Sequence, residues 1–516
     1  MKKVRVIARL DVKGPNVIKG VQFECLRVIG KPGVLAEKYY KEGADELVYL
    51  DIVASLYRRQ NLLNIVNEAS EKIRIPITVG GGVRTLEDIR KLLSAGADKV
   101  AINTAAIKNP KLINESARVF GSQCIVVSIE AKRKGNSWEA YTDNGREKTG
   151  RDAIEWAKEA EKRGAGEILV TSVDQEGTEK GFDIQLMQKI SEKISIPIIA
   201  SGGAGKLEDF SECMLHTRAN AVASASLLHY NKTSITKIKE ILRRKGLSTR
   251  KSPTLPSKKI KAANIDIDNY NKYTLAHLGS MEKEKNKKIE PEKKRSRTKN
   301  ADITIINYGI NNLKSVTRAF EFLGKTVNIA ETPQDIKKAK CLILPGIGAF
   351  GDGMKGLEKR GIIEIIKQRV SEGVPFLGIC LGMQMLFSES EEFGLHRGLD
   401  LIEGRVIKFQ FKKSQPQDEC KIPHMGWNTI QIPKNNNSLK NTILERVKKT
   451  DEVYFVHSFH PVVKNTSNIL AITEYGGKKF PSAVQKNNVM GTQFHPEKSA
   501  EVGLAILKQF CKLFNI

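Results

Sequence analysis

The chain has 516 residues, of which 40% are hydrophobic, and a formal net charge of +27. It is too long for one ordinary hydrophobic core, so we expect two domains of roughly 200–250 residues each. No apolar run reaches the roughly 18 residues of a membrane helix, and Met1 leads directly into a charged strand. We therefore expect neither a membrane span nor a secretory signal.

The seven cysteines are scattered and show no CxxC spacing, which argues against a disulfide framework and against a zinc site. We therefore expect a reducing, cytoplasmic setting, with no metal and no cofactor. Residues 251–300 are basic and poor in apolar side chains, which predicts a flexible linker. A less favoured alternative is that this segment binds RNA. We expect neither nucleic acid nor a membrane as a partner.

From residue 4 to about residue 245, strand patterns alternate with amphipathic helical patterns. Eight strands in about 250 residues favour an α/β fold of the (β/α)8 TIM-barrel type, which we assign to residues 1–250. The predicted strands are 4–12, 45–53, 77–82, 98–103, 124–131, 167–173, 196–203 and 220–226.

The barrel sequence repeats itself after about 120 residues. LDVK (10–13) matches IEAK (129–132) at an offset of 129 − 10 = 119, and TVGGGV (78–83) matches IASGGAG (199–205) at an offset of 199 − 78 = 121. A repeat of this length indicates a duplicated half-barrel.

The duplication places Asp11 and Glu130 at the C-terminal ends of strands 1 and 5, which face each other across the barrel mouth. Barrel active sites are built at this rim, so we predict that one carboxylate acts as general acid and the other as general base. The alternative is that both only cap loops. The glycine turns at 80–82 and 201–203 are duplicated too, and their N–H groups suit phosphates. We therefore predict a substrate with two phosphates.

Residues 1–250 resemble the cyclase subunits of the imidazole glycerol phosphate synthase family. The resemblance is carried by LDVK, TVGGGVRT, KVAINTAAI, FGSQCIVVSIEAKR, GAGEILVTSVDQEGT and IASGGAGK. It implies that Asp11 and Glu130 are the catalytic pair and that a further set of residues binds substrate and phosphate. This set is Lys19, Asp51, Gly82, Asn103, Thr104, Gly177, Thr178, Gly203 and Ser226.

A second strand and helix pattern begins at residue 301 and predicts a second α/β domain, 301–516. Its segment PFLGICLGMQMLF (375–387) holds Cys380 in a G-x-C-x-G turn between an apolar strand and a helix. This turn is typical of a nucleophile elbow, so we predict that Cys380 is a nucleophile. In GTQFHPEKS (491–499), His495 supplies the base that a thiol nucleophile needs, and Glu497 can orient its imidazole.

The Cys and His-x-Glu pattern resembles the class I glutamine amidotransferase triad, and 301–516 resembles the glutaminase subunit of the same synthase. LPGIGAFGDGM and YFVHSF also carry this resemblance. It implies that Gly346 and Gly348 belong to the oxyanion strand. It also implies that glutamine is bound by Gln384, His457 and Ser458.

Together the two resemblances imply one reaction of histidine biosynthesis. Glutamine is hydrolysed in the second domain, which docks on the barrel of the same chain, and ammonia passes through the barrel to the bisphosphorylated substrate. We expect the channel entrance to be a ring of salt bridges at the starts of strands 1, 2, 4 and 6; separate surface ion pairs are the alternative. The ring residues are Arg5, Glu46, Lys99 and Glu167.

Some positions depart from the family pattern. Glu130 and Glu176 stand where the family has Asp, Arg9 stands where it has Cys, and loop 1 reads Gly-Pro-Asn at 14–16. A displacement on the order of 1 Å near the reacting atoms can cost about 10²-fold in rate. Two hypotheses therefore stay open. The favoured one is a synthase of the histidine pathway; the other is a paralogue that delivers ammonia to another acceptor, such as an amidino-sugar of surface-polysaccharide pathways.

Overall fold

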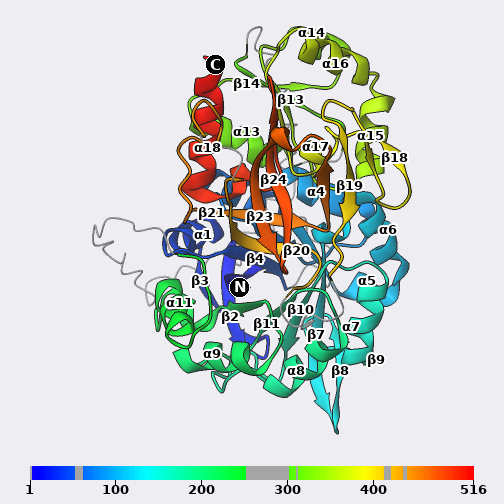
Figure 1. Cartoon of the computed structure of the whole chain (residues 1–516). Coiled ribbons are helices and arrows are strands. Elements are labelled where there is room, and N and C mark those ends of the chain that lie inside the picture. Colours follow the sequence, from blue (N-terminus) through cyan, green and yellow to red (C-terminus); the bar gives the residue numbers. More distant parts are fainter. Residues whose placement is uncertain (1–2, 53–61, 252–300, 310–311, 412–419, 434–438) are drawn as a thin grey trace, which may run out of the picture. The chain divides into compact units, whose positions relative to one another are not determined.

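The first half of the chain forms a closed barrel of eight parallel strands, surrounded by helices (Figure 1). A computed structural model describes residues 3–52, 62–251, 301–309, 312–411, 420–433 and 439–516. The barrel strands pair in the order β1, β4, β5, β6, β7, β10, β11, β12 and back to β1. They are β1 (Arg5–Lys13), β4 (Glu46–Asp51), β5 (Ile77–Gly80), β6 (Lys99–Ile102), β7 (Ile125–Lys134), β10 (Glu167–Ser172), β11 (Ile198–Ser201) and β12 (Ala221–Ser224).

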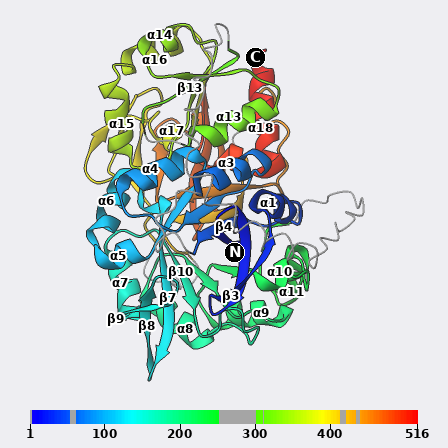
Figure 2. The ribbon, with the colours of Figure 1, turned by 180° about the vertical axis from the view of Figure 1, so that it is seen from behind.

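The predicted TIM barrel is therefore confirmed, and each predicted strand overlaps one of these eight. Helices pack on the outer face of the barrel, as Figure 2 shows from behind. They are α1 (Pro32–Lys41), α3 (Leu62–Lys72), α4 (Leu86–Ala95), α5 (Thr104–Lys108), α6 (Lys111–Phe120), α7 (Ala153–Lys162), α8 (Ile184–Lys193), α9 (Leu207–His216), α10 (Ser226–His229) and α11 (Ile235–Arg244). A ring of apolar side chains fills the barrel interior, and it includes Ile7, Val48, Ala101, Val126, Leu169 and Ile199.

Two hairpin extensions were not predicted. β1 turns into β2 (Asn16–Val21) and β3 (Glu24–Gly30), and β7 turns into β8 (Ser137–Thr142) and β9 (Glu147–Asp152), with antiparallel pairing throughout. Gly14 and Gly135, both at φ +58°, open the two turns, where a left-handed conformation favours glycine. The extensions arise at equivalent strands of the two half-barrels, so they agree with the duplication.

The second half contains a seven-stranded sheet in the order β14, β13, β15, β16, β25, β24, β23, in which the first five strands are parallel. Its strands are β13 (Ile303–Ile306), β14 (Val327–Ala330), β15 (Leu342–Leu344), β16 (Phe376–Ile379), β23 (Ile469–Tyr475), β24 (Lys478–Lys486) and β25 (Val489–Thr492). The helices are α13 (Leu313–Phe322), α14 (Pro333–Lys337), α15 (Phe350–Lys359), α16 (Ile363–Ser371), α17 (Leu381–Gln384) and α18 (Ala500–Leu513). Smaller sheets contain β17 (Glu389–Ser390), β18 (His396–Arg397), β19 (Gly404–Lys408), β20 (His424–Thr429), β21 (Glu452–His457) and β22 (Phe459–Val463).

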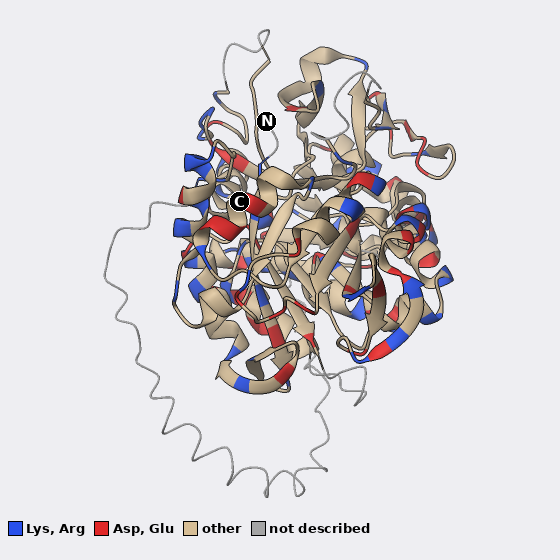
Figure 3. Cartoon of the chain, turned by 90° about the horizontal axis from the view of Figure 1, so that it is seen from below, with Lys and Arg blue, Asp and Glu red and all other residues tan. Residues whose placement is uncertain are grey.

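Met1–Ser252 and Asn300–Ile516 form one compact unit. Contacts between the halves reach the N-terminal ends of barrel strands: Trp427 Nε1 donates to the Asp45 carbonyl at 3.2 Å, and Lys498 Nζ lies 2.8 Å from the Asp98 carboxylate. The predicted linker, apart from Lys251, falls outside the described residues. Acidic and basic side chains are intermingled over the described chain (Figure 3). No helix in the described part of the chain is both long enough and apolar enough to cross a membrane.

Candidate active sites

Cys380 lies in a tight turn between β16 and α17. Its backbone has φ +53° and ψ −105°, a strained conformation for a residue with a side chain, and the residue is 5% exposed. A Cβ on Gly382 would collide with the Leu344 carbonyl, and a Cβ on Gly378 would come within 2.6 Å of the Gly382 carbonyl. The two flanking glycines therefore let the chain turn sharply at the thiol, as the predicted nucleophile elbow requires.

His495 reaches the same place because β25 lies beside β16, with Thr492 in register with Ile379. Its Nδ1 is 2.7 Å from Glu497 Oε1, and its buried Nε2 has no hydrogen-bond partner among the described residues. Burial alone would lower the pKa of His495, but Cys380 and Glu497 raise it well above its usual value. The arrangement therefore favours an imidazolium beside the thiol, with Nε2 free for proton transfer.

The predicted glutamine-binding residues lie on α17, which begins directly after Cys380, and at the end of β21. Gln384 Nε2 donates to the Phe459 carbonyl at 2.9 Å. His457 Nδ1 also lies 2.7 Å from that carbonyl, and burial lowers the pKa of His457 to about 3. Neutral His457 thus donates through Nδ1, which leaves Nε2 to accept from His424 Nδ1 at 3.2 Å. Ser458, half-buried, is the next residue along the chain.

The predicted oxyanion loop follows β15 and lies against the elbow. A Cβ on Gly346 would come within 2.5 Å of Leu381 Cβ, the residue after Cys380. The Gly348 carbonyl accepts a hydrogen bond from Gln123 Nε2 of the barrel at 3.3 Å. The barrel therefore holds one end of the loop from which a backbone N–H would have to stabilise the oxyanion.

Sequence reasoning missed two further residues, one beside the thiol and one beside the segment that follows the predicted oxyanion loop. Gln493 Nε2 lies 3.7 Å from Cys380 Sγ, and its Oε1 accepts from Gln384 at 3.2 Å. Glu392 is buried, accepts a hydrogen bond from Phe350 N at 2.7 Å, and has its pKa raised to about 7 by burial. FSESEEFG contains three glutamates without a distinguishing spacing, so the sequence did not identify Glu392.

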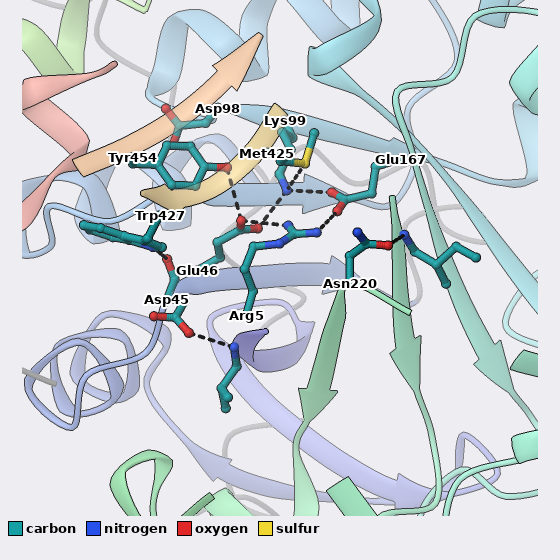
Figure 4. Close-up of polar contacts among 12 residues, drawn as sticks. Arg5, Asp45, Glu46, Asp98, Lys99, Glu167, Asn220, Met425, Trp427 and Tyr454 are labelled. Carbon is teal, nitrogen blue, oxygen red and sulfur yellow. Dashed lines mark hydrogen bonds and ion pairs between the residues drawn. The ribbon is translucent and has the colours of Figure 1, made fainter. Parts of the chain in front are cut away.

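The structure brings the four predicted ring residues together at the N-terminal end of the barrel (Figure 4). Arg5 lies 2.8 Å from Glu46 and 2.5 Å from Glu167, and Lys99 lies 2.7 Å and 2.6 Å from the same two carboxylates. All four side chains are buried. Burial would raise the pKa of Glu46, but Arg5 and Lys99 lower it to about 2. The ring is therefore a closed set of charges rather than separate surface pairs.

Side chains of the second half contact this ring. Tyr454 Oη donates to Glu46 at 3.1 Å, and Lys99 Nζ lies 3.4 Å from Met425 Sδ. Figure 4 shows Tyr454 and Met425 on strands of the second half, next to the ring. β21 carries Tyr454 and ends at His457, so one strand joins the predicted glutamine site to the ring.

Asp11 and Glu130 occupy the opposite end of the barrel. Asp11 Oδ1 accepts from Arg9 Nε at 2.9 Å, and Asp11 Oδ2 lies 3.6 Å from Lys19. Glu130 accepts a hydrogen bond from Gly145 N at 2.8 Å, and burial raises its pKa to about 7. The two carboxylates thus differ in their surroundings: one is ion-paired, and the other holds a proton near neutral pH.

The predicted substrate-binding residues fall into two groups. One group, with Glu130, lines a cavity of about 330 Å³ and consists of Asp51, Gly82, Asn103 and Thr104. The other lines a narrow cavity of about 20 Å³ beside Arg9 and Glu176, and consists of Lys19, Gly177, Gly203 and Ser226. Thr178 lines neither cavity; its hydroxyl donates to the Gln175 carbonyl at 2.8 Å. No cluster of His, Cys, Asp and Glu in the described ranges could hold a metal ion.

A strained cysteine elbow with a His–Glu pair, joined to a barrel with two rim carboxylates, defines a glutamine amidotransferase coupled to a barrel synthase. Residues 5–234 match the family described as Histidine biosynthesis protein, and residues 304–513 match Glutamine amidotransferase class-I. The imidazole glycerol phosphate synthase subunit HisF of Legionella pneumophila is 63% identical over 212 residues, which cover 41% of this chain and 100% of that protein.

HisF of Dehalococcoides mccartyi strain BAV1 is 50% identical over 246 residues, which cover 48% of this chain and 97% of that protein. HisF of strain CBDB1 is 49% identical with the same coverage. The chain therefore belongs to the HisF family of imidazole glycerol phosphate synthase subunits, with a class I glutamine amidotransferase domain fused behind the barrel. It is an enzyme of this type.

Proposed function

We propose that this fused enzyme hydrolyses glutamine at Cys380 and uses the ammonia at the barrel mouth to make imidazole glycerol phosphate and AICAR. The acceptor is the bisphosphorylated formimino-ribulosyl carboxamide ribotide of histidine biosynthesis. The observation that carries this proposal is the position of the Arg5, Glu46, Lys99 and Glu167 ring, which lies inside the barrel and is contacted by the glutaminase half.

In the glutaminase reaction the Cys380 sulfur attacks the amide carbon of glutamine. His495 gives its proton to the departing nitrogen, so that ammonia leaves and a thioester forms. Water, deprotonated by His495, then attacks the thioester carbon and releases glutamate, while the thiol is restored. Glu497 keeps the imidazole oriented by its 2.7 Å contact with Nδ1.

Ammonia then enters the barrel at the ring, which has to open transiently because its four buried side chains are paired with one another. Beyond the ring, the apolar layer that includes Ile7 and Val126 lies between ring and mouth. An apolar passage disfavours ammonium more strongly than ammonia, since burying an unpaired charge is costly. At the mouth Asp11 and Glu130 transfer protons, and the two cavities receive the two phosphates.

The test is to supply the purified enzyme with the bisphosphorylated acceptor and either glutamine or an ammonium salt. Formation of imidazole glycerol phosphate with both nitrogen sources is expected. Glutamine hydrolysis without imidazole glycerol phosphate from either source would overturn the proposal. That result would favour the second hypothesis, a different ammonia acceptor.

A further inference from the structure

The inward-facing side chains of β1 and β7 form three equivalent pairs. They are Ile7 with Val126, Arg9 with Ser128, and Asp11 with Glu130, each separated by 119 positions (126 − 7, 128 − 9 and 130 − 11). Strand register supports this equivalence, because Asp11 lies opposite Leu50 as Glu130 lies opposite Thr171. The duplicated barrel therefore carries a large cation in one half and a small hydroxyl at the same place in the other.

Arg9 is 2% exposed and its guanidinium is held on two sides. Nε donates to Asp11 Oδ1 at 2.9 Å, and Nη1 donates to the hydroxyls of Thr171 and Ser201, each at 2.9 Å. The fork therefore ties the catalytic carboxylate of β1 to strands β10 and β11. A planar guanidinium can do this with fixed geometry, whereas a lysine ammonium cannot.

The hydroxyls that hold Arg9 exist in only one half of the barrel. Thr171 and Ser201 lie opposite each other in β10 and β11, just as Leu50 and Gly80 lie opposite each other in β4 and β5. Leu50 and Gly80 are thus their counterparts, and neither carries a hydroxyl. The two half-barrels therefore differ at three corresponding positions, namely that of the Arg9 cation and those of the two hydroxyl residues that bind it.

The surroundings of the two carboxylates differ accordingly. Asp11 faces Arg9 and Lys19, and Lys19 also pairs with Glu176. Glu130 instead faces the N–H of Gly145, the side chains of Asn103 and Asp143, and the more distant charge of Arg9. Ser128 occupies the position in β7 that corresponds to Arg9 in β1. Its side chain is small, and it lines the cavity of about 330 Å³ together with Glu130 and Leu50.

We propose that Arg9 is a positioning residue that makes the two rim carboxylates unequal, by fixing Asp11 as an ion-paired base and leaving Glu130 as the proton donor. The roles of acid and base rest on the proposed function, whereas the asymmetry itself does not. Arg9 acts through Asp11, and its charge also reaches Glu130.

The first test compares Arg9→Ser, which copies the residue of the other half, with Arg9→Lys. With ammonium and the bisphosphorylated acceptor, Arg9→Ser should lower kcat about 10²-fold because the carboxylate is displaced. KM should rise as well, because Arg9 also lines the narrow cavity that is proposed to take one phosphate. Arg9→Lys should recover only part of kcat, because it restores the charge but not the fork. Arg118→Ser removes an exposed arginine on α6 and serves as the matched control. Glutaminase activity measured without the acceptor reports that each variant is folded.

A kcat of Arg9→Ser within about threefold of the parent would overturn the inference. A second measurement does not depend on turnover: the full-length enzyme is labelled with carbon-13 at the glutamate side-chain carboxyls, and the Glu130 signal is identified by its loss in Glu130→Gln. Its titration midpoint should lie near pH 7 and rise in Arg9→Ser, because the Arg9 charge lowers the pKa of Glu130. An unchanged midpoint would also overturn the inference. Failure of the parent enzyme to turn over the acceptor would instead overturn the proposed function, and the titration would then decide the role of Arg9.

Discussion

We expect Cys380 to be a nucleophile because of its backbone conformation as well as its thiol. The left-handed conformation at φ +53° is one that a buried structural cysteine has no reason to adopt, and two glycines are needed to permit it. The thiol also lies beside a histidine whose pKa it helps to raise. The residue thus has the strain and the partner of an active nucleophile.

The first prediction concerns Cys380→Ala. Glutamine-dependent turnover should fall by at least about 10³-fold, because no other described residue can form the thioester at this position. Ammonium-dependent turnover should stay within about twofold, since the barrel mouth is untouched. Parallel assays with the two nitrogen sources measure both rates. Equal loss of both rates would contradict the division of labour between the two halves.

A second residue-scale prediction follows from the pKa of Glu130. Burial raises this pKa to about 7, so Glu130 is protonated below pH 7 and loses its proton as the pH rises. If Glu130 is the acid, the rate of ammonia transfer from glutamine should fall above pH 7, which gives the pH–rate profile an alkaline limb. Glu130→Gln should lower kcat about 10²-fold and abolish this alkaline limb. The rate is followed from pH 6 to pH 9. An alkaline limb that survives in Glu130→Gln belongs to another group.

The same shift affects stability in a defined direction. The raised pKa means that the folded state binds the proton more tightly than the unfolded chain does. The resulting contribution is fully present below the unfolded-state pKa of about 4.3 and is lost as the pH rises through about 7. Glu130→Gln keeps a neutral side chain, so the Tm of the parent should fall relative to that of Glu130→Gln as the pH rises from about 4.3 to about 7. Thermal unfolding at several pH values measures the difference, and parallel Tm curves would contradict it.

At the scale of elements, the sequence predicted those features that lie within one strand and the turn after it. The barrel strands, the Cys380 elbow and the His495 turn are of this kind, because apolar runs end at glycines or polar residues. The hairpin after β1 escaped prediction because Asn16–Val21 is short and only half apolar. The hydrogen bonds that hold Arg9 could not be predicted either, since Ser201 is 192 positions away in the sequence and no local pattern indicates the contact. The contact of Gln493 with Cys380 was not predicted for the same reason, because it depends on the pairing of β25 with β16.

β7 is one strand that connects the two candidate sites. Just before it begins, Gln123 donates a hydrogen bond to the Gly348 carbonyl of the predicted oxyanion loop, and the middle of the strand carries Glu130. We therefore expect a ligand that shifts Glu130 to affect the predicted oxyanion loop through this strand.

We predict that the bisphosphorylated acceptor raises glutaminase activity through this strand. Gln123→Ala should reduce this stimulation by about fivefold or more, because a lost hydrogen bond of about 1 kcal/mol shifts an equilibrium by about that factor. Unstimulated hydrolysis should change less than the stimulated rate. Gln188→Ala, at an exposed site on α8, is the control. Full stimulation of Gln123→Ala would show that the strand does not carry the coupling.

For the whole molecule, the decisive feature is that the charged ring belongs to the barrel but is completed by the glutaminase half. Two cations and two carboxylates balance within the ring, and all four are buried. Tyr454 and Met425 of the glutaminase half contact Glu46 and Lys99 of the ring. Fusion in one chain raises the effective concentration of the two halves for each other, which favours this contact.

The last prediction uses the charge balance of the ring. Lys99→Met removes one cation and leaves two carboxylates facing one arginine, so it should cost about 3–5 kcal/mol of stability. Adding Glu167→Gln restores neutrality and should recover a large part of this loss, although the ring hydrogen bonds are not rebuilt. Urea unfolding midpoints compare parent, single and double variants; equal midpoints for the two variants would show that charge balance is unimportant.

Both variants should also form less imidazole glycerol phosphate per glutamine hydrolysed, because a ring that no longer closes lets ammonia escape, while turnover with added ammonium salt should persist.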